Sequence, residues 1–227
     1  MYRDYLTARS PVRLLEKGLH GGLGDGNLGV VLAGHGVGKS SFLVGLALDE
    51  LLRDRHVLHV ALDESVDHVR AYYDTVFSDL SSEAQLENSA TVQAECDRNR
   101  SIRVYGSEGF HVGKLREALD LEEETDAKPA LVILDGAEKL AATDVKALRE
   151  LAAEANLELW LAVACGEEKV DGLPERLAAS SDEVSVILAL EPRDGAVALR
   201  ALKDHDSADV SALHVALDPR TLLLVRN

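Results

Sequence analysis

Residues 30–42 read VVLAGHGVGKSSF. An apolar run, typical of a buried strand, breaks into glycines around a histidine and then gives a lysine and two serines. Because glycine has no Cβ, a loop of this composition has little side chain of its own to pack and adopts conformations that other residues avoid. Its backbone N–H groups are therefore free to bind a ligand.

The segment from Ala33 to Ser40 has the pattern of a phosphate-binding loop, G-x-x-x-x-G-K-[ST], with alanine in the first position. The N–H groups of such a loop point at phosphate oxygens, and the following helix adds its positive N-terminal end. Lys39 can reach the β- and γ-phosphates, and the Ser40 hydroxyl can ligate Mg²⁺. His35 stands at a variable position and is interpreted as a loop residue rather than a catalyst. The predicted cofactor-binding residues are Gly34, His35, Gly36, Val37, Gly38, Lys39, Ser40 and Ser41.

Strands and helices alternate along most of the chain. This order predicts an α/β fold whose mostly parallel sheet is covered by helices on both faces. Ser65 and Thr143 are predicted N-caps, and Asn156 a helix stop. The predicted strands are 28–32, 56–62, 101–106, 129–135 and 157–165, and the predicted helices are 39–52, 65–77, 112–124 and 143–156.

Two other segments differ from this alternation. Residues 78–100 are polar and weakly periodic, and we interpret them as a mobile excursion with one short helix. The C-terminal part predicts four strands without intervening helices, an antiparallel meander with a turn at 218–220. Its strands are predicted at 183–191, 195–203, 211–217 and 221–227. The whole chain, 1–227, reads as a single domain with a lead-in at 1–20.

Composition narrows the function classes. A formal charge of −16 without a Lys/Arg-rich stripe disfavours nucleic acid as a partner and is typical of a solvated acidic surface. Cys96 and Cys165 lie far apart without C-x-x-C spacing, so neither a disulfide framework nor a zinc site is indicated. The charged N-terminus does not resemble a signal peptide, and no apolar run approaches the about 20 residues that span a bilayer. We therefore expect a cytoplasmic protein with no membrane segment.

Carboxylates follow two of the predicted strands. Asp135 ends the strand 129–135, and Asp63 and Glu64 follow the strand 56–62. Ligands collect at the carboxyl ends of parallel strands, so Asp135 is expected to hold Mg²⁺ through water. Hydrolysis also needs a group that orients or activates water, and Glu64, ahead of Asp63, is the candidate. The alternative is that these carboxylates and Ser65 only cap the next helix.

Residues 20–65, HGGLGDGNLGVVLAGHGVGKSSFLVGLALDELLRDRHVLHVALDES, resemble the RecA/KaiC superfamily of ATPases. The likeness rests on the GG-l-x-x-G lead-in, the phosphate loop and the strand that ends in paired acids and a serine. It is strong to about residue 75, and residues 195–225 resemble the family's closing segment. It implies a KaiC-like single domain with a RecA-like P-loop fold that binds ATP and Mg²⁺. Its implied roles are Lys39 and Ser40 for nucleotide and metal, Asp63 and Glu64 for water activation, and Asp135 as second metal residue.

The chain departs from the family at two places. Family members often carry a Lys-x-Arg pair that reaches the γ-phosphate of a neighbouring subunit, whereas this chain has Lys203–Asp204–His205. The resemblance thus leaves Lys203 as the catalytic cation, and a missing guanidinium removes a bidentate contact. The alternative is that Lys203 is only a lysine at a strand end that reaches solvent. The strand at 157–165 ends in Ala164–Cys165–Gly166 where the family usually has a polar group, and Cys165 is interpreted as a small buried residue. Both changes disfavour fast hydrolysis more than they disfavour nucleotide binding.

Three functions are compatible with these residues. The first is a slow Mg²⁺-dependent ATPase that acts in a nucleotide-favoured homo-oligomer or with a protein partner. The second is a nucleotide-responsive interaction module with little or no hydrolysis. The third, a recombinase-like ATPase acting on DNA, is disfavoured by the acidic charge.

Overall fold

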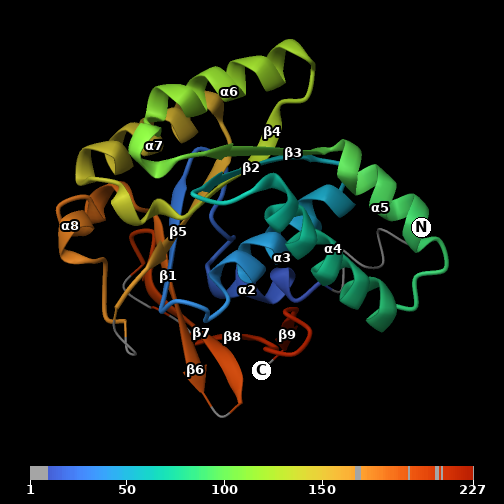
Figure 1. Ribbon diagram of the computed structural model, residues 1–227. Helices are drawn as coiled ribbons and strands as arrows, with labels where there is room; N and C mark the ends of the chain where they lie inside the picture. The colour runs from blue at the N-terminus through green and yellow to red at the C-terminus, as the bar shows by residue number, and fades with distance from the viewer. Residues whose placement is uncertain (1–9, 167–169, 194, 208–209, 211, 227) are drawn as a thin grey trace.

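The computed structural model describes residues 10–166, 170–193, 195–207, 210 and 212–226 (Figure 1). The first nine residues of the predicted lead-in lie outside the described residues, as do Ser211 and Asn227, the ends of two predicted strands.

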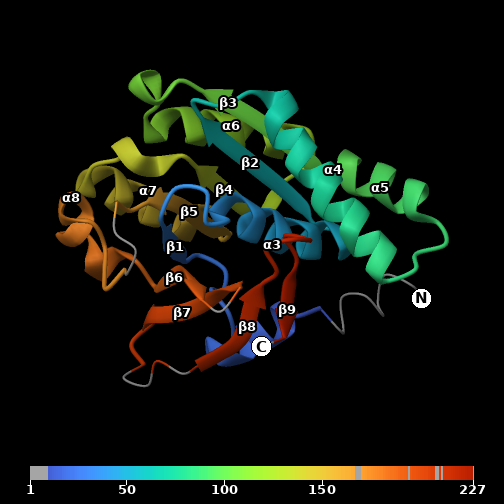
Figure 2. The same cartoon turned by 60° about the horizontal axis from the view of Figure 1, so that its bottom comes forward.

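A single sheet in the order β3-β2-β4-β5-β1-β6-β7-β8-β9 organises the described part of the chain. The first six strands pair in parallel, and β6 to β9 pair as an antiparallel meander at one end of the sheet (Figure 2). The α/β fold with a mostly parallel, helix-flanked sheet and a C-terminal meander is thus confirmed. The strands are β1 Leu28–Ala33, β2 His56–Leu62, β3 Arg100–Tyr105, β4 Pro129–Asp135, β5 Glu158–Ala164, β6 Val186–Arg193, β7 Ala196–Asp204, β8 Ala212–Leu217 and β9 Leu224–Arg226.

Helices cover both faces of the sheet (Figure 1). Successive residues of a strand point to opposite faces, so Val31 and Ala33 pack into one apolar core and Val30 and Leu32 into the other. The first core lies under α2 Val12–Gly18, α3 Lys39–Leu52, α4 Val66–Glu83 and α5 Ser89–Arg98. The second lies under α6 Val112–Glu124, α7 Ala142–Ala155 and α8 Glu175–Ala178. Short 3₁₀ turns are η1 Ser107–Gly109, η2 Ala137–Lys139 and η3 Ser181–Glu183.

Helix termini agree with the predictions in part. The Ser65 hydroxyl caps α4 by accepting from the His68 N–H at 3.2 Å, and Asn156 ends α7 in the left-handed conformation (φ 51°). The predicted cap at Thr143 is wrong, because α7 begins at Ala142 and the Asp144 carboxylate accepts from the Ala141 N–H at 2.9 Å.

The predicted excursion is more regular than its sequence pattern. Within residues 78–100, α4 continues to Glu83 and α5 forms the expected short helix. The mobility of this segment stays a prediction.

The charge of Glu50, on α3, gives the fold a pH dependence. Burial raises the pKa of Glu50 from 4.5 to about 7; the charges of Glu158 and Asp49 raise it further, while Arg55 opposes them. Between about pH 4.5 and pH 7, the folded chain binds more protons at Glu50 than the unfolded chain does. The contribution of Glu50 to the free energy of unfolding therefore falls as pH rises through this range.

We expect Glu50→Gln to remove this loss of stability. The variant should melt at least about 2–4 °C above wild type at pH 8, the shift produced by about 1 kcal/mol in a chain of this size. At pH 4.5 the advantage should disappear, because Glu50 is then largely protonated in the folded state. Thermal unfolding at the two pH values, with the exposed Glu87→Gln as control, checks this; an equal difference at both would contradict it.

Candidate functional site

The loop between β1 and α3 depends on its glycines. All six residues of β1 are buried, and the chain then turns at Gly36 (φ 72°) and Gly38 (φ 115°), the latter being the residue before α3. A Cβ on Gly38 would lie 2.5 Å from Cδ2 of Leu217, the last residue of β8. The side chain at the end of β8 therefore packs directly on the loop, and the positive φ of Gly38 favours glycine there.

The side chain of Lys39, the first residue of α3, reaches back to the start of this loop. This side chain is buried, and Nζ donates to the carbonyl oxygens of Gly34 at 3.1 Å and Ala33 at 3.4 Å. An ammonium group has three N–H donors, so one remains for a ligand. Lys39 thus carries a positive charge into the concave side of the loop.

A cavity of about 370 Å³ opens at the loop. On one side it is bordered by the loop and the first residues of α3, which supply backbone N–H groups at a helix N-terminus. On the other side the wall is mostly apolar and comes largely from the meander. The wall residues are Tyr72, Pro192, Val197, Leu217, Pro219 and Leu222. The cavity therefore offers anion-binding donors beside an apolar surface.

A second, smaller cavity of about 50 Å³ brings together three predicted site residues. Ser40, Glu64 and Asp135 all line it, together with His59 and His68 among others. The three come from different elements: Ser40 from α3, Glu64 from the turn after β2, and Asp135 from the end of β4. Since β2 and β4 are adjacent parallel strands, their carboxyl ends place the two acids at the same edge.

The turn after β4 fixes Asp135. Gly136 has φ 81°, and a Cβ there would lie 2.8 Å from the Leu62 carbonyl oxygen, so glycine must follow the aspartate. The Gly136 N–H donates to Asp135 Oδ1 at 2.9 Å. This bond engages Oδ1 and not Oδ2 of the Asp135 carboxylate.

The oxygen donors fit magnesium. In the part of the chain that is described, no group of three His, Cys, Asp or Glu side chains could hold a metal ion alone. Mg²⁺ is usually bound by one or two protein oxygens together with phosphates and waters, and it retains several waters. The Ser40 hydroxyl and the Asp135 carboxylate, both bordering one cavity beside the loop, are a donor set of that kind.

Asp63 and Glu64 have different surroundings. Asp63 Oδ1 accepts from the Ser107 N–H at 2.9 Å, and Lys139 Nζ lies 4.0 Å from Oδ2. The side chain and the backbone N–H of Ser107 lower the pKa of Asp63, with a smaller effect from Lys139. Glu64 is half-exposed, lies 3.8 Å from His68 Nε2 and borders the small cavity, which Asp63 does not. Ser65, not either acid, supplies the hydrogen-bonded cap of α4.

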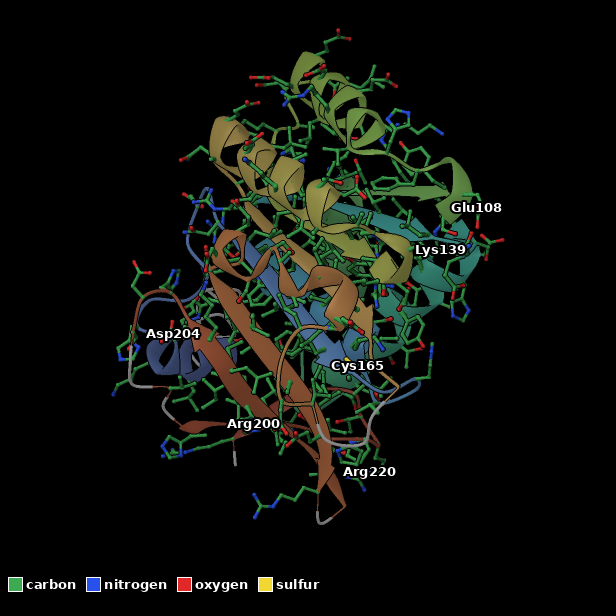
Figure 3. All side chains as sticks on the ribbon, turned by 90° about the vertical axis from the view of Figure 1, so that its left-hand side faces the viewer. Glu108, Lys139, Cys165, Arg200, Asp204 and Arg220 are labelled. Carbon is green, nitrogen blue, oxygen red and sulfur yellow. The ribbon has the colours of Figure 1, made fainter. Side chains whose placement is uncertain are left out.

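Lys203 does not lie near the loop of its own chain. It pairs with Ile187 near the start of β6, at the amino end of the parallel strands, whereas the loop follows their carboxyl ends. Its Nζ donates to the Ser181 carbonyl oxygen at 2.8 Å. Figure 3 shows neighbouring Asp204 on the opposite side of the molecule from Lys139 and Glu108. Within the chain, then, Lys203 is separate from the other predicted site residues.

The residues after Lys203 have partners within the chain. Asp204 is buried, and its Oδ2 lies 2.5 Å from His20 Nδ1. The His205 ring places Nε2 3.0 Å from the Gly22 carbonyl oxygen. His205 therefore connects the end of β7 to the segment before β1.

Cys165 lies next to the loop. Its N–H donates to the Ala33 carbonyl oxygen at 2.9 Å, and it is half-buried rather than buried as the sequence suggested. Together with Gly34, His35 and Pro192, it borders a third cavity of about 520 Å³. Residues at the end of β5 thus form one flank of the loop.

Sequence reasoning missed several residues of this region. His59 interrupts the apolar run HVLHVAL, and a polar residue in a buried strand was a signal for a role. Tyr72 and His68 lie on one side of α4, and no motif marked them. Pro219 and Leu222 reach the loop only because β8 and β9 fold back onto it.

Comparisons with known proteins give no family assignment. No protein-family model matches the chain. A search of curated proteins finds no significant relative. Among the described residues, no helix is both long and apolar enough to cross a membrane.

Proposed function

We propose that this chain is a RecA/KaiC-type protein that binds ATP with Mg²⁺ and hydrolyses it slowly, in a homo-oligomer or with a protein partner. The observation that carries the proposal is the convergence of Ser40, Glu64 and Asp135 on one cavity, directly beside the glycine loop that holds Lys39. Each of these groups has a distinct use in binding a nucleotide triphosphate and its metal.

The chain's own residues account for each part of the ligand. Loop N–H groups and the N-terminus of α3 bind phosphate oxygens, and the free N–H of Lys39 adds a charged donor. The apolar wall that includes Leu217 and Pro219 offers a surface for the nucleoside base. Ser40 and Asp135 would hold Mg²⁺, which when bound neutralises charge on the phosphate oxygens.

Glu64 is the residue proposed to act on water. Half-exposed at the edge of the small cavity, its carboxylate can accept a proton or orient a water toward the phosphates. Asp63 is less suited, since Ser107 already donates to its Oδ1.

A second candidate, a nucleotide-responsive module with little hydrolysis, is favoured by one observation. Among the described residues that line the loop cavity, Lys39 is the only lysine or arginine. Charge developing on the γ-phosphate would therefore meet few cations within one subunit. Hydrolysis then depends on what a neighbour or partner supplies.

One titration separates these candidates. Purified protein is titrated with ATP and with ADP in Mg²⁺, while phosphate release and molar mass are recorded in the same samples. Binding with phosphate release that rises with protein concentration supports the ATPase. Binding without release supports the module, and absence of binding contradicts both.

Lys203→Ala tests the role of the neighbour. In the family that the chain resembles, the segment holding Lys203 reaches the nucleotide of another subunit. We expect the variant to lose most of the concentration-dependent phosphate release and to keep its ATP affinity, because Lys203 is remote from the loop of its own chain. The exposed Lys146→Ala on α7 is the matched control. Light scattering that shows a monomer at all concentrations, with and without ATP, would contradict the assembly.

A further inference from the structure

A buried histidine stands behind the small cavity. His59 occupies the middle of β2, between apolar residues, and only 2% of its surface is exposed. An imidazole at such a position is costly unless its two nitrogens are hydrogen-bonded. Its contacts therefore show what it does there.

One nitrogen has a partner within the fold. His59 Nδ1 lies 3.1 Å from the hydroxyl of Tyr73, a buried residue of α4, and the two rings meet edge to face. The Arg100 guanidinium lies 4.4 Å from the centre of the Tyr73 ring. Burial, with a smaller effect from Arg100, lowers the pKa of His59 to about 3, so its ring is neutral.

The second ring nitrogen, Nε2, is buried and unpaired among the described residues. If the Tyr73 O–H donates to Nδ1, its hydrogen is used and Nε2 carries the ring proton. The opposite tautomer would leave both the tyrosine hydrogen and Nε2 unpaired, so it is the costlier arrangement. His59 thus presents an unused N–H donor.

His59 is part of the lining of the cavity that the predicted metal-side residues Ser40, Glu64 and Asp135 share. The Nδ1 edge of its ring meets Tyr73, which does not line this cavity, and we take the opposite edge, with Nε2, as the cavity side. The volume, about 50 Å³, accommodates one water. The side-chain oxygen atoms of Ser40, Glu64 and Asp135 and the N–H donor of His59 all belong to residues that line this cavity.

We propose that His59 is a positioning residue for the magnesium site: its Nε2–H donates to a water in this cavity, and that water holds the metal-facing carboxylate of Asp135 in place. The inference rests on the proposed nucleotide function and adds a residue to it. Such outer partners of metal ligands orient the ligand and raise metal affinity, and their loss typically costs roughly 10–100-fold. Tyr73 in turn fixes the tautomer that makes the histidine a donor.

The test replaces the pair as a unit. In His59→Leu/Tyr73→Phe both polar partners become apolar groups of similar size, which leaves no buried group unpaired and keeps the melting temperature near or above that of wild type. His59→Gln retains an N–H donor. Val57→Ala, a buried residue on the same face of β2 that does not line the cavity, controls for loosening of the core.

Binding of a fluorescent ADP analogue is measured from EDTA through a Mg²⁺ series. We expect the double variant to bind as wild type does in EDTA and to need roughly 10–100-fold more Mg²⁺ for the metal-dependent gain in affinity. His59→Gln should lie between the two, and Val57→Ala should match wild type. The electron paramagnetic resonance of Mn²⁺ with ADP gives a second readout of metal affinity that does not depend on turnover.

The outcomes distinguish a failure of the role proposed for His59 from a failure of the proposed nucleotide function. An unchanged Mg²⁺ requirement in the double variant, with nucleotide binding intact, overturns the role of His59 and leaves the proposed function standing. A wild-type chain that binds no nucleotide overturns the proposed function, and the inference with it. If the double variant does not fold, His59→Gln and Tyr73→Phe alone decide, and a lower melting temperature with unchanged Mg²⁺ requirement assigns His59 to packing only.

Discussion

Lys39→Ala is expected to weaken ATP binding roughly ten- to a hundredfold and to leave the melting temperature without nucleotide nearly unchanged. The loss corresponds to the about 1.5–3 kcal/mol of a hydrogen bond to a charged group. It arises because Lys39 is the one lysine or arginine among the described residues that line the loop cavity.

The fold does not depend on this ammonium group. Its bonds within the chain go to the carbonyl oxygens of Ala33 and Gly34. The Ala33 oxygen also accepts from the Cys165 N–H at 2.9 Å, so it stays paired when the lysine is removed. Gly34 is partly exposed, and water can replace the second bond.

Calorimetric titration with ATP and Mg²⁺ gives the affinity, and thermal unfolding without nucleotide gives the stability. Lys139→Ala is the matched control: that lysine is exposed and bonds Glu108 at 2.6 Å, outside the loop cavity. Wild-type affinity in Lys39→Ala would remove the phosphate-binding assignment. A large fall in melting temperature would instead make Lys39 a structural residue of the loop.

The sequence predicted the parts of this site that follow from local pattern and strand direction. The bounds of α3, α6, β2 and β4 agree with the predicted ranges, because each has a clear apolar period or a continuous apolar run. The meeting of Glu64 with Asp135 follows from parallel pairing, which brings the carboxyl ends of strands to one edge. No contact information was needed for either.

Other features depend on tertiary contacts that no local pattern carries. The polar character of residues 78–100 hid the continuation of α4 to Glu83 and the bounds of α5, in which only Val92 and Cys96 are buried. The closeness of Leu217 to Gly38 arises only when the meander folds onto the loop. The hydroxyl of Thr143 made it a plausible cap, yet the side chain of Asp144 satisfies the free N–H at that end.

The position of Lys203 follows from strand direction rather than from the motifs. A strand that pairs antiparallel to β6 must end at the amino edge of the parallel sheet, away from the loop. The motifs alone do not predict the position of Lys203, because a motif does not specify the direction of the strand on which it lies. Within its own chain, Lys203 is therefore remote from any ligand bound at the loop.

The two acids after β2, Asp63 and Glu64, are expected to differ clearly in their effect on phosphate release when each is replaced by its amide. Glu64→Gln should lower phosphate release by about 10²–10⁴, the usual contribution of general acid–base catalysis, and keep ATP affinity within about twofold. Asp63→Asn should leave phosphate release near that of wild type. The two variants are a matched pair, since each replaces one carboxylate by an amide of the same shape at adjacent positions.

The physical reason is the difference in their contacts. Glu64 borders the cavity that Ser40 and Asp135 share, is half-exposed and lies 3.8 Å from His68 Nε2, so its carboxylate is available to a water. Asp63 has φ 58° and accepts from the Ser107 N–H, a bond that joins the turn after β2 to the turn after β3. An asparagine keeps a carbonyl acceptor for that bond and tolerates this left-handed conformation.

Phosphate release and ATP affinity are measured for both variants, with their melting temperatures. Loss of release in Asp63→Asn but not in Glu64→Gln would transfer the water-activating role to Asp63. A lower melting temperature of Glu64→Gln with unchanged release would reduce Glu64 to a charge at the N-terminus of α4, where acids are favourable. If neither variant changes a wild-type rate that is itself close to zero, the chain acts through nucleotide binding alone, and the acids shape the pocket rather than the reaction.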